Sequence, residues 1–126
     1  MDLLTTQKRI LCVEDHGDTC ELIALLLRDY KVISAHSKAE ALRLASSEHF
    51  DLFLLDYNLP DGMGIEVCLL IRTFDKKTPI LFSTAFDLLT EVQAEAVGAQ
   101  GIIRKGVSFS DELMVQATQF LRTAPQ

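Results

Sequence analysis

Three acidic side chains stand directly after two short apolar runs of the chain. Glu14 and Asp15 follow the run 10–13. Asp56 follows the run 52–55. If these runs are neighbouring parallel strands, their carboxylates converge at one edge of the sheet, where like charges repel unless a cation lies among them. Acidic residues often end strands in solvent, but three of them at two strand ends favour a site for a hard divalent cation, which we expect to be Mg²⁺ with several retained waters.

A hydroxyl and an ammonium group follow two further apolar runs. Thr84 comes shortly after the run 79–82, and Lys105 comes shortly after the run 101–103. Alone, a threonine is most often an ordinary strand residue and a lysine a solvated charge. At the ends of successive strands, however, these groups can hold a phosphoryl oxygen and balance its charge. We therefore expect them at the same edge as the carboxylates.

Short continuous apolar runs alternate along the chain with longer segments of helical period, which is typical of strand and helix units around a parallel sheet. The expected strands are the runs 10–13, 31–35, 52–55, 79–82 and 101–103. Five such units favour an α/β fold, a doubly wound five-stranded parallel sheet of order 2-1-3-4-5 with five helices, because a closed barrel needs eight. Ligands of such a sheet lie beyond the carboxyl ends of its strands.

Polar residues indicate where the helices begin. Ser37 and Glu40 form a capping box before the second helix, and Asp18 and Glu21 form a capping pattern at the first. Between the third strand and the third helix, the segment 58–64 is rich in proline, aspartate and glycine, which predicts a loop.

Apolar residues around the start of the fourth helix have two interpretations. Leu88, Val92 and Ala96 recur at helical spacing, and Phe86 and Leu89 lie beside the first of them. Ordinary packing against the sheet and a docking surface for a partner both explain such a face.

Two further residue types could do chemistry, but we interpret them as structural. His16 lies next to Asp15, yet a histidine at a junction between loop and helix is more often a solvated or capping residue, so it is not assigned to the site. Cys12, Cys20 and Cys68 are odd in number, lack CxxC spacing and lie in apolar stretches. We expect them to be buried, reduced thiols.

The composition excludes several classes of protein. The 126 residues, 48% of them hydrophobic and 24% charged, suit one domain with a real core. A net charge of −6 and a pI near 4.9 are unfavourable for binding nucleic acid or an anionic membrane. No apolar run approaches a bilayer span, and residues 1–6 lack the features of a signal peptide, so we expect a cytoplasmic protein.

In their order and spacing, the site groups resemble the receiver domain of two-component response regulators. The matching features are the pair Glu14 and Asp15, Asp56 within DLFLLDYNLPDGMGIEV, Thr84 within PILFSTA, and Lys105 after GAQGIIR. The resemblance covers about residues 8–121. It implies a flavodoxin-like fold and a single receiver domain over residues 1–126.

The resemblance also implies a set of metal contacts. Asp15 is expected as a direct Mg²⁺ ligand, with Asp56 beside it and Glu14 acting through water. The backbone carbonyl of Asn58 is expected to complete the protein's contacts with the metal.

For the phosphoryl group, the resemblance implies that Asp56 is the acceptor. Thr84 is expected to bind a phosphoryl oxygen, and Lys105 to pair with Asp56 or its phosphate. The expected donor is a sensor histidine kinase or a phosphotransfer protein. The expected recipient of the signal is a downstream protein or an output domain outside this chain, and the domain itself is not expected to be an enzyme.

Two positions depart from the family's pattern. Ile102 stands where most receivers carry an aromatic residue that turns inward when the phosphorylated state is favoured. Gly106 stands where a proline after a cis peptide bond is common. Because a cis bond before a residue other than proline costs about 2.5 to 4 kcal/mol, we expect a trans bond here, or else a strained one held by its loop.

These departures leave a second hypothesis open, a receiver-like interaction module whose switch is lost or independent of phosphate. A third hypothesis is a phosphohydrolase that uses Asp56 as its nucleophile. It is the weakest, because Asn58 stands where such an enzyme needs an acid and the chain has no cap insertion for a substrate.

Overall fold

The computed structural model describes residues 7–122 of the expected domain 1–126. Residues 1–6 and 123–126 lie outside the described part, and so does the expectation that residues 1–6 lack a signal peptide. Strands and helices alternate, as the apolar pattern predicts. In chain order the elements are β1 (Arg9–Val13), α1 (Gly17–Leu26), β2 (Lys31–Ala35), α2 (Lys38–Ser47), β3 (Leu52–Leu55), β4 (Asn58–Leu59), β5 (Gly62–Met63), α3 (Gly64–Ile71), β6 (Ile80–Thr84), α4 (Glu91–Ala96), β7 (Gly101–Arg104) and α5 (Phe109–Arg122).

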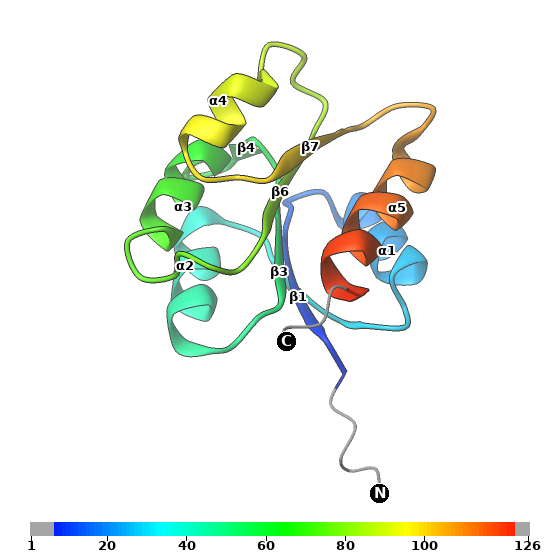
Figure 1. The fold of residues 1–126 in the computed structure, drawn as a ribbon, viewed down its shortest axis with the longest axis horizontal. Coiled ribbons are helices and arrows are strands. Elements are labelled where there is room, and N and C mark those ends of the chain that lie inside the picture. Colours follow the sequence, from blue (N-terminus) through cyan, green and yellow to red (C-terminus); the bar gives the residue numbers. More distant parts are fainter. Residues whose placement is uncertain (1–6, 123–126) are drawn as a thin grey trace, which may run out of the picture.

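Five of the strands form one parallel sheet of order β2-β1-β3-β6-β7, which confirms the predicted order. Helices α2, α3 and α4 cover one face of this sheet, and α1 and α5 cover the other (Figure 1). The central strands are buried on both faces, which is why they are continuously apolar instead of alternating. The fold is the expected doubly wound α/β sandwich.

Each face of the sheet carries its own apolar core. Phe53 and Phe82, from adjacent strands, are buried beneath α2, α3 and α4. Leu54, next to Phe53, and Leu81, next to Phe82, are buried on the opposite face of the sheet. There they share a core with Leu113 of α5. Because successive side chains of a strand point to opposite faces, both cores hold the same strands in place.

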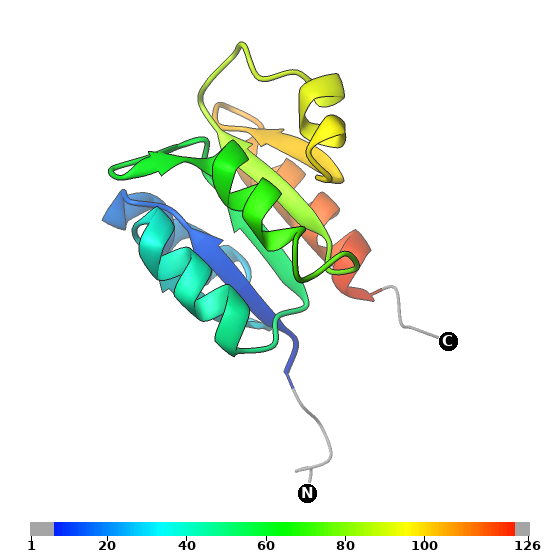
Figure 2. The ribbon, with the colours of Figure 1, turned by 90° about the vertical axis from the view of Figure 1, so that its left-hand side faces the viewer.

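The pairing of the strands decides where polar side chains leave the sheet. The Asp56 N–H donates to the Val13 carbonyl at 2.9 Å, so Glu14 and Asp56 follow paired strands at the same edge. The Lys105 N–H donates to the Thr84 carbonyl at 2.9 Å, which brings this pair to that edge as well. Figure 2 shows the carboxyl ends of the strands at the end of the molecule where the β4-β5 hairpin lies.

The segment 58–64 is more ordered than the predicted loop. It contains an antiparallel hairpin in which Asn58 pairs with Met63, and Pro60 and Asp61 form the turn between the two strands. Strands of two residues carry no apolar periodicity, so sequence reasoning found the turn residues but not the strands.

The predicted helix starts have different outcomes. At α2, half of the predicted capping box forms: the Ser37 hydroxyl accepts a hydrogen bond from the Glu40 N–H at 3.1 Å, but the Glu40 carboxylate accepts from the His36 N–H instead of that of Ser37. The capping pattern at the first helix is wrong, because α1 begins at Gly17 and Asp18 lies inside its first turn. An acidic residue there still interacts favourably with the helix dipole.

The two interpretations of the apolar residues around α4 apply to different residues. Leu88 and Val92 are 74% and 75% exposed, so packing does not cover them; Leu88 lies before α4, and Val92 lies in its first turn. Leu89 is buried in the core, and the Phe86 ring stacks on that of Tyr57 with centroids 4.4 Å apart. Packing within the domain therefore explains why apolar residues stand at positions 86 and 89.

Three smaller expectations concern the described part of the chain. None of its helices has both the length and the apolar character needed to cross a membrane. Cys12, Cys20 and Cys68 are free and buried, as expected. Residues 7–122 contain no cis peptide bond, so the bond between Lys105 and Gly106 is trans.

Candidate functional site

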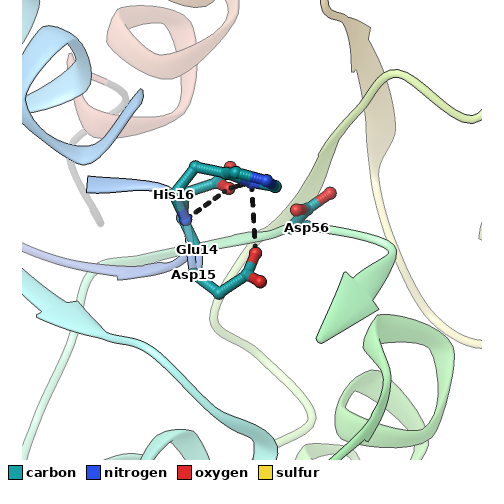
Figure 3. Close-up of side chains that lie close together, drawn as sticks. All are labelled: Glu14, Asp15, His16 and Asp56. Atoms are coloured by element: carbon teal, nitrogen blue, oxygen red, sulfur yellow. Dashed lines mark hydrogen bonds and ion pairs between the residues drawn. The ribbon is translucent and has the colours of Figure 1, made fainter. Parts of the chain in front are cut away.

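Three carboxylates meet at the carboxyl ends of β1 and β3, and we call Glu14, Asp15 and Asp56 the acidic cluster. One ligand atom from each of them, and one from His16, all lie within 4.8 Å of one another. Figure 3 shows the four side chains turned toward a shared space. Glu14 and Asp56 are buried, whereas the Asp15 side chain is 33% exposed. The acidic cluster therefore opens to solvent on the Asp15 side.

The ammonium group of Lys105 reaches the acidic cluster from the loop after β7. Its Nζ lies 2.6 Å from Glu14 Oε1 and 3.5 Å from Asp56 Oδ2. The lysine side chain is only 20% exposed, so solvent and salt weaken these ion pairs less than they would weaken surface pairs. The structure thus brings Lys105 to Asp56, as expected, but its shorter contact is with Glu14.

The two buried carboxylates differ in how readily they ionise. Burial raises the pKa of Asp56 to about 6, and the nearby charge of Glu14 adds to this effect, while Lys105 and the Tyr57 N–H oppose it. Burial also opposes the ionisation of Glu14, but Lys105 and the hydrogen bonds from His16 outweigh it and hold the Glu14 pKa below its usual value. Glu14 is therefore the firmly ionised member of the pair.

A cavity of about 320 Å³ lies beside the acidic cluster. Thr84 is buried in its wall, and its Oγ1 accepts a hydrogen bond from the Phe86 N–H at 2.9 Å. The threonine hydroxyl keeps its own proton, which it can donate to an oxygen in the cavity. The lining residues are His16, Asp56, Asn58, Thr84, Ala85, Phe86 and Lys105.

The donor set of the acidic cluster fits a hard divalent cation. When all three carboxylates are ionised, they and Lys105 together leave two net negative charges, which one divalent cation balances. Carboxylate oxygens are the ligands that Mg²⁺ prefers, and the opening at Asp15 leaves room for retained water. Asn58, expected to contribute its carbonyl, lies at the start of β4 and lines the same cavity.

His16 belongs to this site, although sequence reasoning left it out. It occupies the N-cap position of α1, but its side chain does not cap the helix. Instead its Nδ1 lies 3.0 Å from Glu14 Oε2 and 3.2 Å from Asp15 Oδ1. These carboxylates raise the His16 pKa above its usual value, Glu14 most strongly. The position of His16 directly after two acidic residues was the sequence signal for a role in the site. Only the structure shows that the backbone turns there and brings the ring back over Glu14 and Asp15.

The β4-β5 hairpin, which follows Asp56 in the chain, is held in place at both of its ends. The carboxylate of Asp61 at its turn accepts hydrogen bonds from the N–H groups of Lys38 and Ala39, at 2.6 and 3.0 Å, and so binds the start of α2. Where the hairpin meets α3, the Gly64 N–H donates to the Tyr57 carbonyl at 2.6 Å. Neither contact was predicted, because each depends on tertiary structure.

Comparison with known proteins identifies relatives of this fold and site. The family model described as "Response regulator receiver domain" matches residues 10–118. Response regulator protein PilR of Pseudomonas aeruginosa is 35% identical over 105 residues, which are 81% of this chain and 24% of the relative. Response regulator ArlR of Staphylococcus aureus is 33% identical over 121 residues, 94% of this chain and 54% of the relative.

Solved structures show the same fold. The response regulator TrrA of Thermotoga maritima, in complex with Mg²⁺-BeF, is 31% identical with a TM-score of 0.81, covering 90% of this chain and 98% of that one. The chemotaxis response regulator CheY4 of Vibrio cholerae is 28% identical with a TM-score of 0.82, covering 91% and 99%. The chain spans about a quarter of the length of PilR and about half that of ArlR.

Proposed function

The chain belongs to the response regulator receiver domain family, and from this membership we propose that it accepts a phosphoryl group on Asp56 in a Mg²⁺-dependent step. The observation that carries the proposal is the position of Asp56. Its carboxylate is buried within the acidic cluster, beside Lys105 and in the wall of a cavity large enough for a phosphoryl group. We further propose that residues 1–126 form a single receiver domain, with its core at about residues 8–121.

Asp56 supplies the nucleophile. With a pKa of about 6, it is ionised in most molecules at pH 7. One of its oxygens forms a bond to phosphorus while the bond from phosphorus to the donor nitrogen breaks, and the donor imidazole leaves with the electron pair. The Tyr57 N–H, which donates to Asp56 Oδ1 at 2.7 Å, holds the carboxylate in one orientation, and its other oxygen, Oδ2, lies 3.5 Å from Lys105 Nζ.

Positive charge must offset the repulsion between the carboxylate and the incoming phosphoryl group. Asp15, Asp56 and the Asn58 carbonyl are the proposed ligands of Mg²⁺, with Glu14 acting through water. When bound, the cation neutralises charge on the phosphoryl oxygens. The structure of the relative TrrA in complex with Mg²⁺-BeF supports a Mg²⁺-dependent step.

Lys105 and Thr84 are placed to bind the product. An acyl phosphate adds about 1.5 to 2 negative charges. The Lys105 ammonium, 3.5 Å from Asp56, can pair with one phosphoryl oxygen, and the Thr84 hydroxyl can donate to another. Movement of these two groups would bias the surface formed by α4, β7 and α5 between two states.

Ile102 affects how phosphorylation of Asp56 can change the surface formed by α4, β7 and α5. It is 6% exposed and packs in the core beneath α4. An aliphatic side chain cannot form the hydroxyl hydrogen bond that an aromatic phenol would make. The interaction-module hypothesis rests on this residue and on Gly106, but it does not account for the complete set of charged groups around Asp56, so it is not favoured.

The partners follow from the chemistry of the transfer. We propose that a sensor histidine kinase or a phosphotransfer protein is the donor, and that a downstream protein or an output domain outside this chain receives the signal. The longer relatives PilR and ArlR are response regulators of which this chain spans only a part. We infer a signalling role and no turnover of a free substrate.

Phosphorylation by a small donor tests the proposal. We expect incubation with Mg²⁺ and acetyl phosphate to add one phosphoryl group, detected by intact-mass spectrometry. The adduct should be absent from Asp56→Asn and from a sample with excess chelator. Asp29→Asn, which changes an exposed aspartate, is the control and should keep the adduct. An adduct that survives in Asp56→Asn would refute the assignment, and so would none in wild type with either acetyl phosphate or a cognate kinase.

Asp61 is a positioning residue in this account, because it holds the hairpin that begins at Asn58. We expect Asp61→Ala to weaken Mg²⁺ binding about tenfold, measured by calorimetric titration. Asp61→Asn should restore part of the affinity, because its one amide oxygen can accept from only one of the two N–H groups. Equal affinity of Asp61→Ala and wild type would show that the hairpin needs no such contact.

A further inference from the structure

The imidazole of His16 has a position that a purely oxygen-ligated Mg²⁺ site does not require. Its Nδ1 lies within 3.2 Å of a carboxylate oxygen of both Glu14 and Asp15. Ligand atoms of His16 and the whole acidic cluster fall within the same 4.8 Å. Figure 3 shows the ring extending over the site from the residue after Asp15. The chain therefore offers one nitrogen donor among three carboxylates.

This nitrogen is available to a cation. The His16 side chain is 72% exposed, so its ring can turn without disturbing the core, and ligation costs little desolvation. In the described structure, its partners are the same carboxylates that the cation would draw together. A cation bound to Nδ1 would replace these hydrogen bonds with bonds to the metal, and the proton on Nδ1 would be released to solvent or carried by Nε2 instead.

The type of donor decides which cation is favoured. Carboxylate, carbonyl and water ligands suit Mg²⁺, whereas an imidazole raises the affinity for first-row transition metals, and Mn²⁺ accepts both kinds of ligand. Mg²⁺ gains little from nitrogen. We propose that His16 is a direct ligand of the divalent cation, so that this receiver selects Mn²⁺ over Mg²⁺. The proposal rests on the proposed function, because it concerns the cation that assists phosphorylation of Asp56.

Binding of Mn²⁺ and its competition with Mg²⁺ test the proposal. Electron paramagnetic resonance of unbound Mn²⁺ measures both affinities, and pulsed measurements on bound Mn²⁺ detect coupling to a ligating ¹⁴N nucleus. The variant is His16→Gln. The matched control is His49→Gln, because His49 is also exposed and lies 3.1 Å from a carboxylate, that of Asp51, away from the acidic cluster.

We expect ¹⁴N coupling in wild type and in His49→Gln, and none in His16→Gln. The ratio of Mn²⁺ to Mg²⁺ affinity should fall at least about tenfold in His16→Gln alone. If wild type binds both cations and forms the Asp56 adduct but shows no ¹⁴N coupling, the His16 proposal is overturned and the proposed function stands. If wild type binds neither Mn²⁺ nor Mg²⁺, the His16 proposal and the proposed function are both overturned.

Discussion

Asp56→Asn should stabilise the protein at pH 8 in the absence of divalent cations, by about 3 kcal/mol. In the folded chain, burial raises the pKa of Asp56 to about 6, from a usual value of 3.8. The folded state therefore binds the proton more tightly than the unfolded state. Stability is lost as the pH rises from about 4 through about 6, and it stays low above that range. Asparagine carries no charge and avoids the loss.

Urea unfolding in excess chelator measures this effect. The difference in the free energy of unfolding between Asp56→Asn and wild type should be largest at pH 8 and should shrink toward zero at pH 4. Asp29→Asn is the control, and it should change the free energy of unfolding by less than about 0.5 kcal/mol. An Asp56→Asn variant no more stable than wild type at pH 8 would show that Lys105 fully compensates the buried carboxylate.

Gly64→Ala should lower the free energy of unfolding by about 3 kcal/mol. A Cβ at this position would lie 2.0 Å from the carbonyl oxygen of Asp56 and 3.2 Å from the Cα of Tyr57. Both neighbours are backbone atoms of the segment that carries the acceptor, so the start of α3 must move away from that segment. A displacement of about 1 Å at Asp56 should also slow phosphorylation about a hundredfold.

A second glycine provides the comparison. A Cβ added to Gly17, the first residue of α1, would meet no other atom within 4 Å, and the residue has no positive φ. Gly17→Ala should therefore leave stability unchanged or raise it by up to about 1 kcal/mol. Urea midpoints and the rate of adduct formation report both effects. Equal midpoints for Gly64→Ala and Gly17→Ala would contradict the close approach at Asp56.

The central part of the site could be predicted from the sequence because it depends on the sheet alone. Continuous apolar runs identified the strands, and parallel pairing brings their carboxyl ends together. Glu14, Asp56 and Lys105 each follow such a strand directly, so a small error in a strand boundary does not move them to another edge. Thr84 is the last residue of β6 instead of one beyond it, yet it reaches the same cavity.

The surroundings of the site could not be predicted, because they depend on turns and on tertiary contacts. The side chain of His16 folds back over the acidic cluster, a result of local backbone direction that residue type does not encode. Asp61 was expected to be only a turn residue, but it binds the start of α2, which precedes it by more than twenty residues. Helical spacing placed Leu88 on the fourth helix, but α4 begins only at Glu91, and the Leu88 side chain is exposed.

Chemical mapping of the phosphorylated residue tests the central claim most directly. Borohydride reduces an aspartyl phosphate to homoserine, which mass spectrometry of proteolytic peptides locates. After treatment with acetyl phosphate, we expect homoserine at position 56, only when Mg²⁺ or Mn²⁺ is present. Homoserine at position 15 or 61, or a phosphoryl group that resists borohydride and remains on a hydroxyl such as that of Ser83, would contradict Asp56 as the acceptor.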